Sequence, residues 1–396
     1  GVITKIGLKT FVDPRLEGGK MNERTKEDLV ELIEMDGEEW LRYKSFPVNV
    51  ALIRATYCDE DGNATMDKEA ATLDSLAIAQ AAKNSGGIVL LQVEKVVQNG
   101  TLDARKVKIP GIYVDGIVVS RPENHWQTYE AHYNPALCGE VKVPVDSIPP
   151  MKLNERKIIC RRAAMELDPQ AIINLGIGMP EGIANVANEE GLPGLKLTVE
   201  TGGIGGVPMA GTAFGTCTNP TAILDQPYQF DFYDGGGLDQ AFLGLAECDR
   251  FGNINVSRFG PKIAGCGGFI NITQTAPVVV YCGTFTAGGL KVEVKDGKLQ
   301  ILQEGKIKKF IRDVEQVTFG AAYAKETGQK VLYVTERAVF ELIDGELTLT
   351  EIAPGVELEK DILAHMEFRP AIAEDLKEMD ARIFRDEIMG LLAEKE

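Results

Sequence analysis

The sequence contains Ala55-Thr56-Tyr57-Cys58-Asp59-Glu60-Asp61-Gly62-Asn63, and it repeats this stretch in outline as Leu245-Ala246-Glu247-Cys248-Asp249-Arg250-Phe251-Gly252-Asn253. The Cys, Asp, Gly and Asn pairs are all separated by the same 190 residues, and four identities in one register argue for an internal repeat. Each copy is followed by a short apolar run, at 86–93 and 277–283, of the kind that forms strands buried on both faces. The chain is therefore predicted to contain two related α/β domains.

The length of 396 residues also favours two domains, because single cores stop growing at roughly 250 to 300 residues. The join is placed near Val145–Pro150, where two prolines interrupt regular structure. This division gives residues 1–150 to a first domain and residues 151–396 to a second. The second domain opens with Asn154 as a helix N-cap, followed by Ala171–Leu175 as a strand. Mapped back by 190 residues, this opening falls before Gly1, so the first domain is predicted to lack its N-terminal part.

The composition, with 44% hydrophobic and 26% charged residues, is that of an ordinary soluble globular protein. A net charge of −17 without a dense Lys/Arg block disfavours nucleic acid as a partner. The sequence shows neither an apolar run of about 18 residues nor a signal-peptide pattern, so no membrane partner and a cytoplasmic location are predicted. The seven cysteines form no CxxC pair and are interpreted as packing residues. The three histidines lack metal-ligand spacing, so no metal site is predicted.

Glu200 follows the strand-like run Leu197–Val199 and precedes a loop with glycines at 202, 203, 205 and 206. Such a loop gives a carboxylate little side-chain cover and allows other backbone, or a ligand, to approach closely. A carboxylate held in this way can act as a covalent nucleophile. The alternative roles for Glu200 are to cap a turn or to pair with an arginine.

Further glycine clusters lie beside predicted strands. Gly176–Gly182 follows a strand and opens a helix, where backbone amides can receive an anion or a carbonyl oxygen. A dinucleotide site is disfavoured because Glu181 stands where the third glycine of that fingerprint belongs, although a tight turn without a ligand also fits. Together with Gly235–Gly237 and Gly265–Gly268, the cluster suggests several backbone segments converging on one ligand. The sequence has neither a Walker A motif nor a GxSxG elbow.

The C-terminal part of the chain is predicted to be rich in hairpins. Residues 296–319 alternate apolar and polar positions around Gly297 and Gly305. Residues 331–335 and 338–342 resemble a strand pair, and Asp344-Gly345 a turn. The tail from Glu374 to Glu394 is predicted to be a helix with a solvated charged face.

Several stretches together resemble the family I CoA-transferases, and they are most similar to the acetate/propionate branch. They are Phe11–Arg15 with Glu17–Lys20, Thr198–Gly202 with Ile204–Gly206, Phe230–Tyr233 with Gly235–Asp239, Gly267–Ile270, and Thr335–Phe340. The resemblance implies two tandem open-sheet α/β domains of the CoA-transferase type. It also implies a further N-terminal α/β segment that this chain lacks, so that a separate segment or fragment becomes a candidate partner.

The resemblance assigns roles to the candidate residues. Glu200 would form a glutamyl-CoA thioester, and Gly267 and Gly268 would supply backbone amides near the reacting carbonyl. The turn Gly176, Ile177, Gly178, Met179 and Pro180 would contact CoA. The implied substrates are an acyl-CoA and a short-chain carboxylate, with no cofactor beyond CoA as substrate, and the implied assembly is a homo-oligomer.

Two classes of alternative function stay open at the sequence level. An acyl-CoA hydrolase would use the same residues with water as the acceptor. A non-catalytic ligand-binding module, or a sugar-phosphate isomerase on a similar fold, would not explain a glutamate in its glycine loop.

Overall fold

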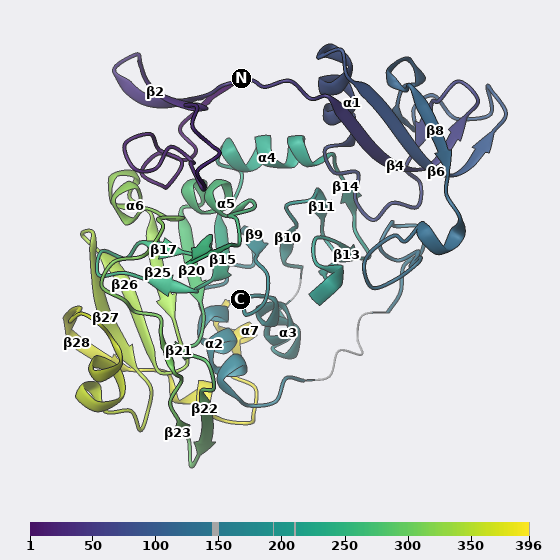
Figure 1. Cartoon of the computed structure of the whole chain (residues 1–396). Helices are drawn as coiled ribbons and strands as arrows, with labels where there is room; N and C mark the ends of the chain where they lie inside the picture. The colour runs from purple at the N-terminus through teal and green to yellow at the C-terminus, as the bar shows by residue number, and fades with distance from the viewer. Residues whose placement is uncertain (145–149, 193, 210, 396) are drawn as a thin grey trace. The chain divides into compact units, whose positions relative to one another are not determined.

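The computed structural model of the chain describes residues 1–144, 150–192, 194–209 and 211–395 (Figure 1). Two compact units emerge from its contacts. Unit 1 comprises Gly1–Lys44, Ile148–Lys196 and Tyr233–Glu396, and unit 2 comprises Ser45–Ser147 and Leu197–Phe232. The segment with Glu200 therefore groups with the first half of the sequence. Most of the join predicted at 145–150 lies outside the described residues, and the division at residue 150 stays a prediction.

Unit 1 is built on a parallel sheet of short, apolar strands. Strand β15 (Gln240–Gly244) pairs in parallel with β9 (Ile172–Leu175) and with β20 (Val278–Cys282), and β20 pairs in parallel with β25 (Lys330–Val334). The sheet continues through β26 (Ala338–Ile343), β27 (Glu346–Ile352) and β28 (Ala371–Glu378). Most residues of β15 and β20 are buried, as expected for strands covered on both faces. The predicted α/β class is confirmed.

The two helices of unit 1 whose starts the sequence predicts, α2 and α3, are confirmed. Asn154 caps α2 (Glu155–Ala164), because its side chain accepts a hydrogen bond from the Lys157 amide at 3.1 Å. Helix α3 (Glu181–Glu189) buries Ile183, Val186 and Ala187. Two shorter helices come later in the chain. Helix α5 (Phe269–Thr275) follows β19 (Lys262–Ile263), and helix α6 (Ala321–Thr327) directly precedes β25.

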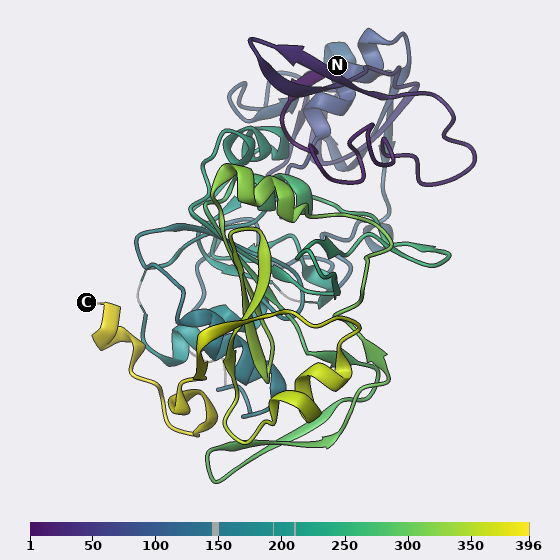
Figure 2. The ribbon, with the colours of Figure 1, turned by 90° about the vertical axis from the view of Figure 1, so that its left-hand side faces the viewer.

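The predicted C-terminal helix from Glu374 to Glu394 is wrong. Residues Ala371–Glu378 form β28, which pairs in parallel with β27, and only Leu391–Lys395 form a helix, α7. Figure 2 shows the C-terminal segment lying beside α2. The buried guanidinium of Arg161 on α2 donates to the backbone carbonyl of Glu387 at 2.8 Å and also to that of Arg385. These tertiary bonds hold the tail out of the helical conformation that its composition favours.

The predicted hairpins are confirmed in outline. Strands β22 (Lys291–Lys295) and β23 (Lys298–Gln303) pair through the turn Asp296-Gly297. Strands β26 and β27 pair through Asp344-Gly345. Both turns place two consecutive residues at positive φ, which is the conformation that Asp-Gly favours in a two-residue hairpin. Gly305 lies between β23 and β24 (Ile307–Lys308), which pairs instead with β21 (Thr286–Ala287).

The N-terminal segment forms a small sheet of β1 (Val2–Thr4), β3 (Glu38–Tyr43) and β2 (Val30–Met35), and its loop packs on α5. The side chain of Gln274 on α5 accepts from the Gly7 amide at 2.6 Å and donates to the Leu8 carbonyl at 2.8 Å. The buried carboxylate of Asp13 accepts from the Lys9 amide at 2.8 Å and from Arg15. Residues 6–20, which include the stretch Phe11–Lys20, are therefore a structural clamp in this unit, called the N-terminal clamp below.

Unit 2 contains the sheet β7-β5-β4-β6-β8, with helix α1 (Ser75–Asn84) on one face. The strands of this sheet are β4 (Val50–Asp59), β5 (Ala64–Thr65), β6 (Ile88–Val97), β7 (Val107–Ile109) and β8 (Gly116–Val119). The side chains of alternate residues on β4 and β6 pack in one core with Ala79 and Ala82 of α1. On the other face, Leu52 is 77% exposed.

The second segment of unit 2 carries short strands. They are β11 (Gly203–Ile204), β12 (Val207–Pro208), β13 (Cys217–Thr218) and β14 (Ala222–Ile223), preceded by β10 (Lys196–Thr198) and followed by α4 (Gln226–Asp234). Strand β11 pairs antiparallel with both β10 and β14.

The internal repeat is confirmed by hydrogen bonding. The Asp59 carboxylate accepts from the Asn63 amide at 2.9 Å and from the Asn63 side chain at 2.9 Å. The Asp249 carboxylate accepts the same pair of bonds from Asn253, both at 3.0 Å. The strand registers repeat as well, because Val50 lies opposite Ile88 and Gln240 lies opposite Val278 in the two parallel pairs. The same α/β arrangement therefore occurs once in each half of the chain.

Candidate active site

Glu200 lies at the tip of a tight hairpin between β10 and β11. Thr198 pairs with Ile204, the Val199 amide donates to the Gly203 carbonyl at 2.8 Å, and the Gly202 amide donates to the Val199 carbonyl at 3.0 Å. The Glu200 side chain is half-buried in this hairpin. Both ends of the turn are thus hydrogen-bonded, which fixes the backbone of the glutamate.

The glycines of this loop are required by close backbone contacts. Gly202 has φ of +114°, and a Cβ atom there would lie 2.0 Å from the Leu224 carbonyl oxygen. A Cβ atom on Gly206 would lie 2.2 Å from the Thr218 carbonyl oxygen. The sequence allowed either other backbone or a ligand to approach this loop closely. At Gly202 and Gly206 the groups that come close are carbonyl oxygens of the chain's own backbone.

The Glu200 hairpin is anchored to the first-half sheet within unit 2. The Thr72 hydroxyl donates to the Leu224 carbonyl at 3.1 Å, and the Gln226 amide donates to the Leu73 carbonyl at 3.1 Å. Lys108 forms an ion pair with Asp225 at 3.1 Å. These contacts connect the segment after the hairpin to the turn that precedes α1 and to β7.

A pocket of about 590 Å³ lies beside the hairpin, inside unit 2. Thr201, the neighbour of Glu200, lines this pocket, and its hydroxyl donates to the Gly215 carbonyl on another wall. The remaining walls come from Leu52–Arg54 of β4, the stretch Glu69–Ile78, the loop Trp126–Tyr129, and Thr212–Thr216. The residue that follows Glu200 on the hairpin therefore borders a cavity large enough for a small organic molecule.

The charges in this pocket are balanced locally. Arg54 forms an ion pair with the buried carboxylate of Glu69, which also accepts from the Thr56 hydroxyl at 3.0 Å. Burial lowers the pKa of Arg54 and raises the pKa of Asp74. Arg54 is thus already matched by an anion, and the pocket offers little net positive charge.

The turn Gly176–Pro180 lies in unit 1, between β9 and α3, as predicted. Gly178 has φ of +81° with open space where a Cβ atom would stand, and Ile177 is 59% exposed. By contrast, a Cβ atom on Gly176 would lie 2.7 Å from Leu243, and one on Gly182 would lie 2.6 Å from the sulfur of Cys160. Gly176 and Gly182 therefore serve packing, whereas Ile177 and Gly178 present an open backbone surface.

Gly267 and Gly268 lie in unit 1 at the start of α5. Gly267 has φ of +50°, and Gly268 is the N-cap residue of the helix. Phe11 and Ile6 of the N-terminal clamp pack against Ile270 and Cys266 beside this turn. The clamp therefore supports the backbone of the two glycines. Because Glu200 belongs to unit 2 and these turns belong to unit 1, their assembly into one site stays a prediction.

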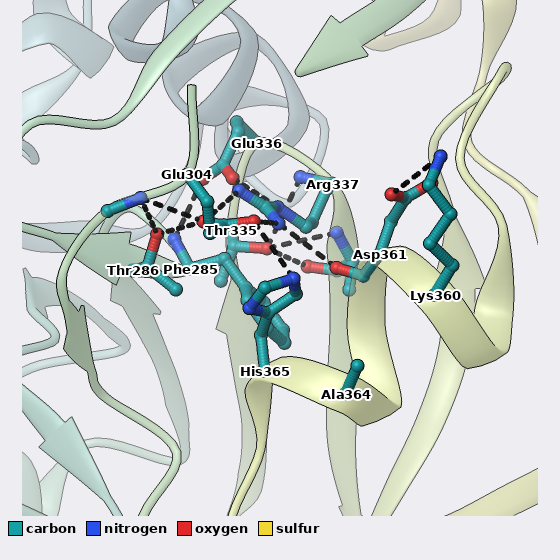
Figure 3. A network of polar contacts seen from close by, with 12 residues as sticks. Phe285, Thr286, Glu304, Thr335, Glu336, Arg337, Lys360, Asp361, Ala364 and His365 are labelled. Carbon is teal, nitrogen blue, oxygen red and sulfur yellow. Dashed lines mark hydrogen bonds and ion pairs between the residues drawn. The ribbon is translucent and has the colours of Figure 1, made fainter. Parts of the chain in front are cut away.

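The stretch Thr335–Phe340 forms a buried polar network in unit 1 (Figure 3). Glu336 and Arg337 have no exposed surface, and the Arg337 Nε donates to the Glu336 carboxylate at 2.7 Å. Glu336 also accepts from the Phe285 amide at 2.8 Å, while Arg337 pairs with Glu304 at 2.6 Å. The network joins the turn after β25 to two neighbouring loops, so the stretch has a structural role.

Sequence reasoning missed the pocket residues Arg54, Leu73 and Phe214. A signal was available in the repeat, because Gly265–Gly268 maps by 190 residues onto Ser75–Ile78, which borders the pocket.

Among the described residues, no group of three His, Cys, Asp or Glu side chains could hold a metal ion. The seven cysteines are free thiols, five of them buried, which fits the predicted packing role. No helix in the described part of the chain is long and apolar enough to cross a membrane.

Comparisons with known proteins show the family to which the chain is similar. The family described as Coenzyme A transferase matches residues 1–120. The caffeate CoA-transferase of Acetobacterium woodii is 52% identical over 398 residues, which cover 99% of this chain and 76% of that protein. The acetate CoA-transferase YdiF of Escherichia coli K12 is 50% identical over 393 residues, covering 99% of this chain and 74% of that protein.

The chain belongs to the family I CoA-transferases, in the branch that includes the acetate CoA-transferases. The crystal structure of the acyl-CoA transferase YdiF of Escherichia coli O157:H7, described as a thioester complex with CoA, superposes with a TM-score of 0.91. It shares 49% identity, and the match covers 98% of this chain and 73% of that one. The fold and the transfer of CoA are thus supported by the same relatives.

Proposed function

We propose that this CoA-transferase exchanges CoA between an acyl-CoA and a short-chain carboxylate through a glutamyl-CoA thioester on Glu200. The observation that carries the proposal is a half-buried carboxylate on a hydrogen-bonded hairpin, directly before a residue that lines a 590 Å³ pocket. A carboxylate fixed in this way can attack a thioester without reorganising its backbone. The description of the YdiF structure as a thioester complex supports a covalent route.

The reaction would proceed in balanced steps. The Glu200 carboxylate attacks the acyl-CoA carbonyl, which forms a mixed anhydride and releases the CoA thiolate. The thiolate then attacks the glutamyl carbonyl, which forms the glutamyl-CoA thioester and releases the first carboxylate. The acceptor carboxylate repeats both steps in reverse, so that Glu200 is regenerated. Each attack passes through an oxyanion, for which the amides near Gly267 and Gly268 are the proposed donors.

The open backbone at Ile177 and Gly178 is the proposed contact for CoA. The start of α3 presents peptide dipoles that favour an anionic group, although Glu181 stands in the first turn. Arg156 offsets this charge, because it donates to the Gly178 carbonyl at 2.6 Å and lies 3.5 Å from the Glu181 carboxylate. No cofactor beyond CoA is part of the proposal. A cytoplasmic location and a homo-oligomeric assembly are proposed with the family and stay untested.

The experiment is trapping of the covalent intermediate. After incubation with acetyl-CoA, hydroxylamine or borohydride should modify Glu200 alone, as read by peptide mass spectrometry. Glu200→Gln should abolish both the modification and the exchange, while the melting temperature stays unchanged. Modification of a different carboxylate, or exchange at an unchanged rate in this variant, would contradict the assignment. Continuous release of free acid and free CoA without an added acceptor, beyond one equivalent per Glu200, would favour the hydrolase alternative instead.

A further inference from the structure

We propose that Arg156 and Cys160, one turn apart on α2, are positioning residues for CoA. They hold the carbonyl groups of Gly178 and Met179 on the side of α2, so that the amide of Met179 points away from α2 and donates to an acceptor oxygen of CoA. The inference rests on the proposed function, because it takes the turn at Gly176–Pro180 to contact CoA.

The first contact is made by the guanidinium of Arg156. Its Nη2 atom donates to the Gly178 carbonyl at 2.6 Å and lies 3.5 Å from the Glu181 carboxylate. One nitrogen therefore serves both oxygens, and the contact needs only a single well-placed cationic donor. The Arg156 side chain is 39% exposed, whereas that of Glu181 is only 12% exposed. The ion pair thus neutralises a largely buried carboxylate next to the proposed binding surface.

The second contact is made by the thiol of Cys160. Its Sγ atom donates to the Met179 carbonyl at 3.3 Å. Burial raises the pKa of this thiol to about 12, so the sulfur keeps its proton at neutral pH. The same carbonyl also accepts from the Gly182 amide at 3.2 Å, where α3 begins. Residues four apart on a helix lie on one face, which is why α2 reaches two successive carbonyls of the turn.

The orientation of the Met179 amide follows from the planarity of the peptide. The Gly178 carbonyl and the Met179 amide belong to one trans peptide unit, in which the C=O and N–H bonds point in opposite directions. Because the carbonyl is directed at Arg156, the amide is directed away from α2. The next peptide offers no donor, since Pro180 has no amide hydrogen. Met179 therefore supplies the donor that the two contacts orient.

The turn is open at the residues that precede this amide. Ile177 is 59% exposed, and a Cβ atom on Gly178 would meet open space. A ligand can therefore approach the backbone here without displacing a side chain.

Arg156 is not needed to hold α2 and α3 together. The buried ion pair of Lys157 and Glu189 joins the two helices at 2.6 Å. A Cβ atom on Gly182 would lie 2.6 Å from the Cys160 sulfur, so the helices are already in close contact. Loss of Arg156 should therefore change the turn and leave the packing of the two helices intact.

The test measures CoA binding and turnover in the full chain. Arg156→Met should raise both the Kd of CoA, from isothermal titration calorimetry, and the KM of acetyl-CoA at least about tenfold, which is the factor that one hydrogen bond of ordinary strength contributes. The kcat should stay within about threefold, because the contact serves binding and not the chemical step. Arg156→Lys should keep the Kd within about threefold, since one ammonium can replace the single Nη2 atom that makes both contacts.

Arg250→Met is the matched control. Arg250 follows β16 (Glu247–Cys248), is 40% exposed and pairs with Asp313 at 3.0 Å, so it has the exposure and the kind of partner that Arg156 has. This variant should change neither the Kd nor the KM. All three variants should melt within about 5 °C of the unmodified protein, because half-exposed ion pairs contribute little to stability.

A second measurement follows the amide itself by NMR. In protein made with isotope-labelled methionine, the amide resonance of Met179 is identified by its absence in Met179→Leu. Saturation with CoA should shift this resonance, and Arg156→Met should move it before CoA is added. Arg250→Met should leave the resonance unchanged.

The proposal is overturned if the Met179 resonance does not respond to saturating CoA, or if Arg156→Met binds CoA as tightly as the unmodified protein. An equal loss of affinity in Arg156→Lys, or a loss of kcat without a change in Kd and KM, also overturns it. CoA binding that depends on Arg156, in a protein that forms no thioester on Glu200, supports this inference and defeats the proposed function. A thioester on Glu200 together with a CoA affinity independent of Arg156 does the reverse, so the two failures are distinguishable.

Discussion

Substitution of Arg337 by methionine should destabilise unit 1 more than any exposed change would. Arg337 is completely buried and holds the Glu336 carboxylate at 2.7 Å, and it also donates to the Asp361 carbonyl at 3.0 Å. Arg337→Met keeps an unbranched, largely apolar side chain but leaves Glu336 buried without the Arg337 guanidinium. Removal of one partner from a buried ion pair costs about 3 to 5 kcal/mol.

The loss in the free energy of unfolding should be measured by urea denaturation followed by circular dichroism. It equals the shift of the urea midpoint multiplied by the denaturant slope. For a unit of this size the same loss lowers the melting temperature by about 2 to 4 °C per kcal/mol. The matched control is the double variant Arg337→Met with Glu336→Gln, in which the remaining side chain is neutral and still accepts from the Phe285 amide. This second change should restore about 1 to 3 kcal/mol.

Trapping of the Glu200 thioester reports on function in the same samples. Each variant should form the thioester to the same extent per folded molecule, because the network shown in Figure 3 stabilises the fold and is not part of the proposed site. A loss below about 1 kcal/mol in Arg337→Met, or no recovery in the double variant, would refute the reasoning from burial.

Three further predictions concern the glycine loops and a buried lysine. Gly202→Ala should lower stability clearly more than Gly236→Ala, since both residues have positive φ but only at Gly202 would a Cβ atom meet backbone, 2.0 Å away; equal melting temperatures would contradict this. Gly178→Val should weaken CoA binding, measured by calorimetry, far more than it lowers the melting temperature, because the space around Gly178 is open; a large stability loss with unchanged CoA affinity would assign the turn a packing role only. Burial lowers the pKa of Lys309 to about 8, from 10.5. Between these values the unfolded chain binds more protons at this site, so the free energy of unfolding should rise with pH by about 3 kcal/mol, and Lys309→Met should remove that rise while stabilising the protein at pH 7. Identical pH slopes of stability from pH 8 to 10.5 in the two proteins would show that Lys309 keeps its ordinary pKa.

Elements with a strong local pattern could be predicted from the sequence. The run at 277–283 contains β20 because Val278–Cys282 are apolar and mostly β-branched or aromatic, which favours a buried strand. Asp344-Gly345 becomes a turn because few dipeptides adopt two positive φ values so easily. The glycine loop after Glu200 could be predicted in the same way, but the pairing of β10 with β11 that makes it a hairpin was not predicted. The function came from the resemblance that these residues carry, together with the repeat.

Features that depend on distant partners could not be predicted. The tail 374–394 has helical composition, but pairing with β27 and the guanidinium of Arg161 decide its conformation. The burial of Glu336 and Arg337 contradicts the usual exposure of charged residues, and only the position of Glu304 and Phe285 explains it. The grouping of Glu200 with the first half depends on contacts of Leu224 and Gln226 with the turn at Thr72 and Leu73.

The discontinuity of unit 2 sets an order of events during synthesis. A ribosome that has released residues up to Ser147 has supplied the five-stranded sheet of this unit, but the second segment of the unit, Leu197–Phe232, arrives only after a stretch that belongs to unit 1. The proposed nucleophile therefore cannot take up its final environment on a nascent chain that ends before this segment has left the exit tunnel. Slow codons or a pause placed between the two segments would lengthen the time in which the incomplete unit is exposed to chaperones and to other nascent chains.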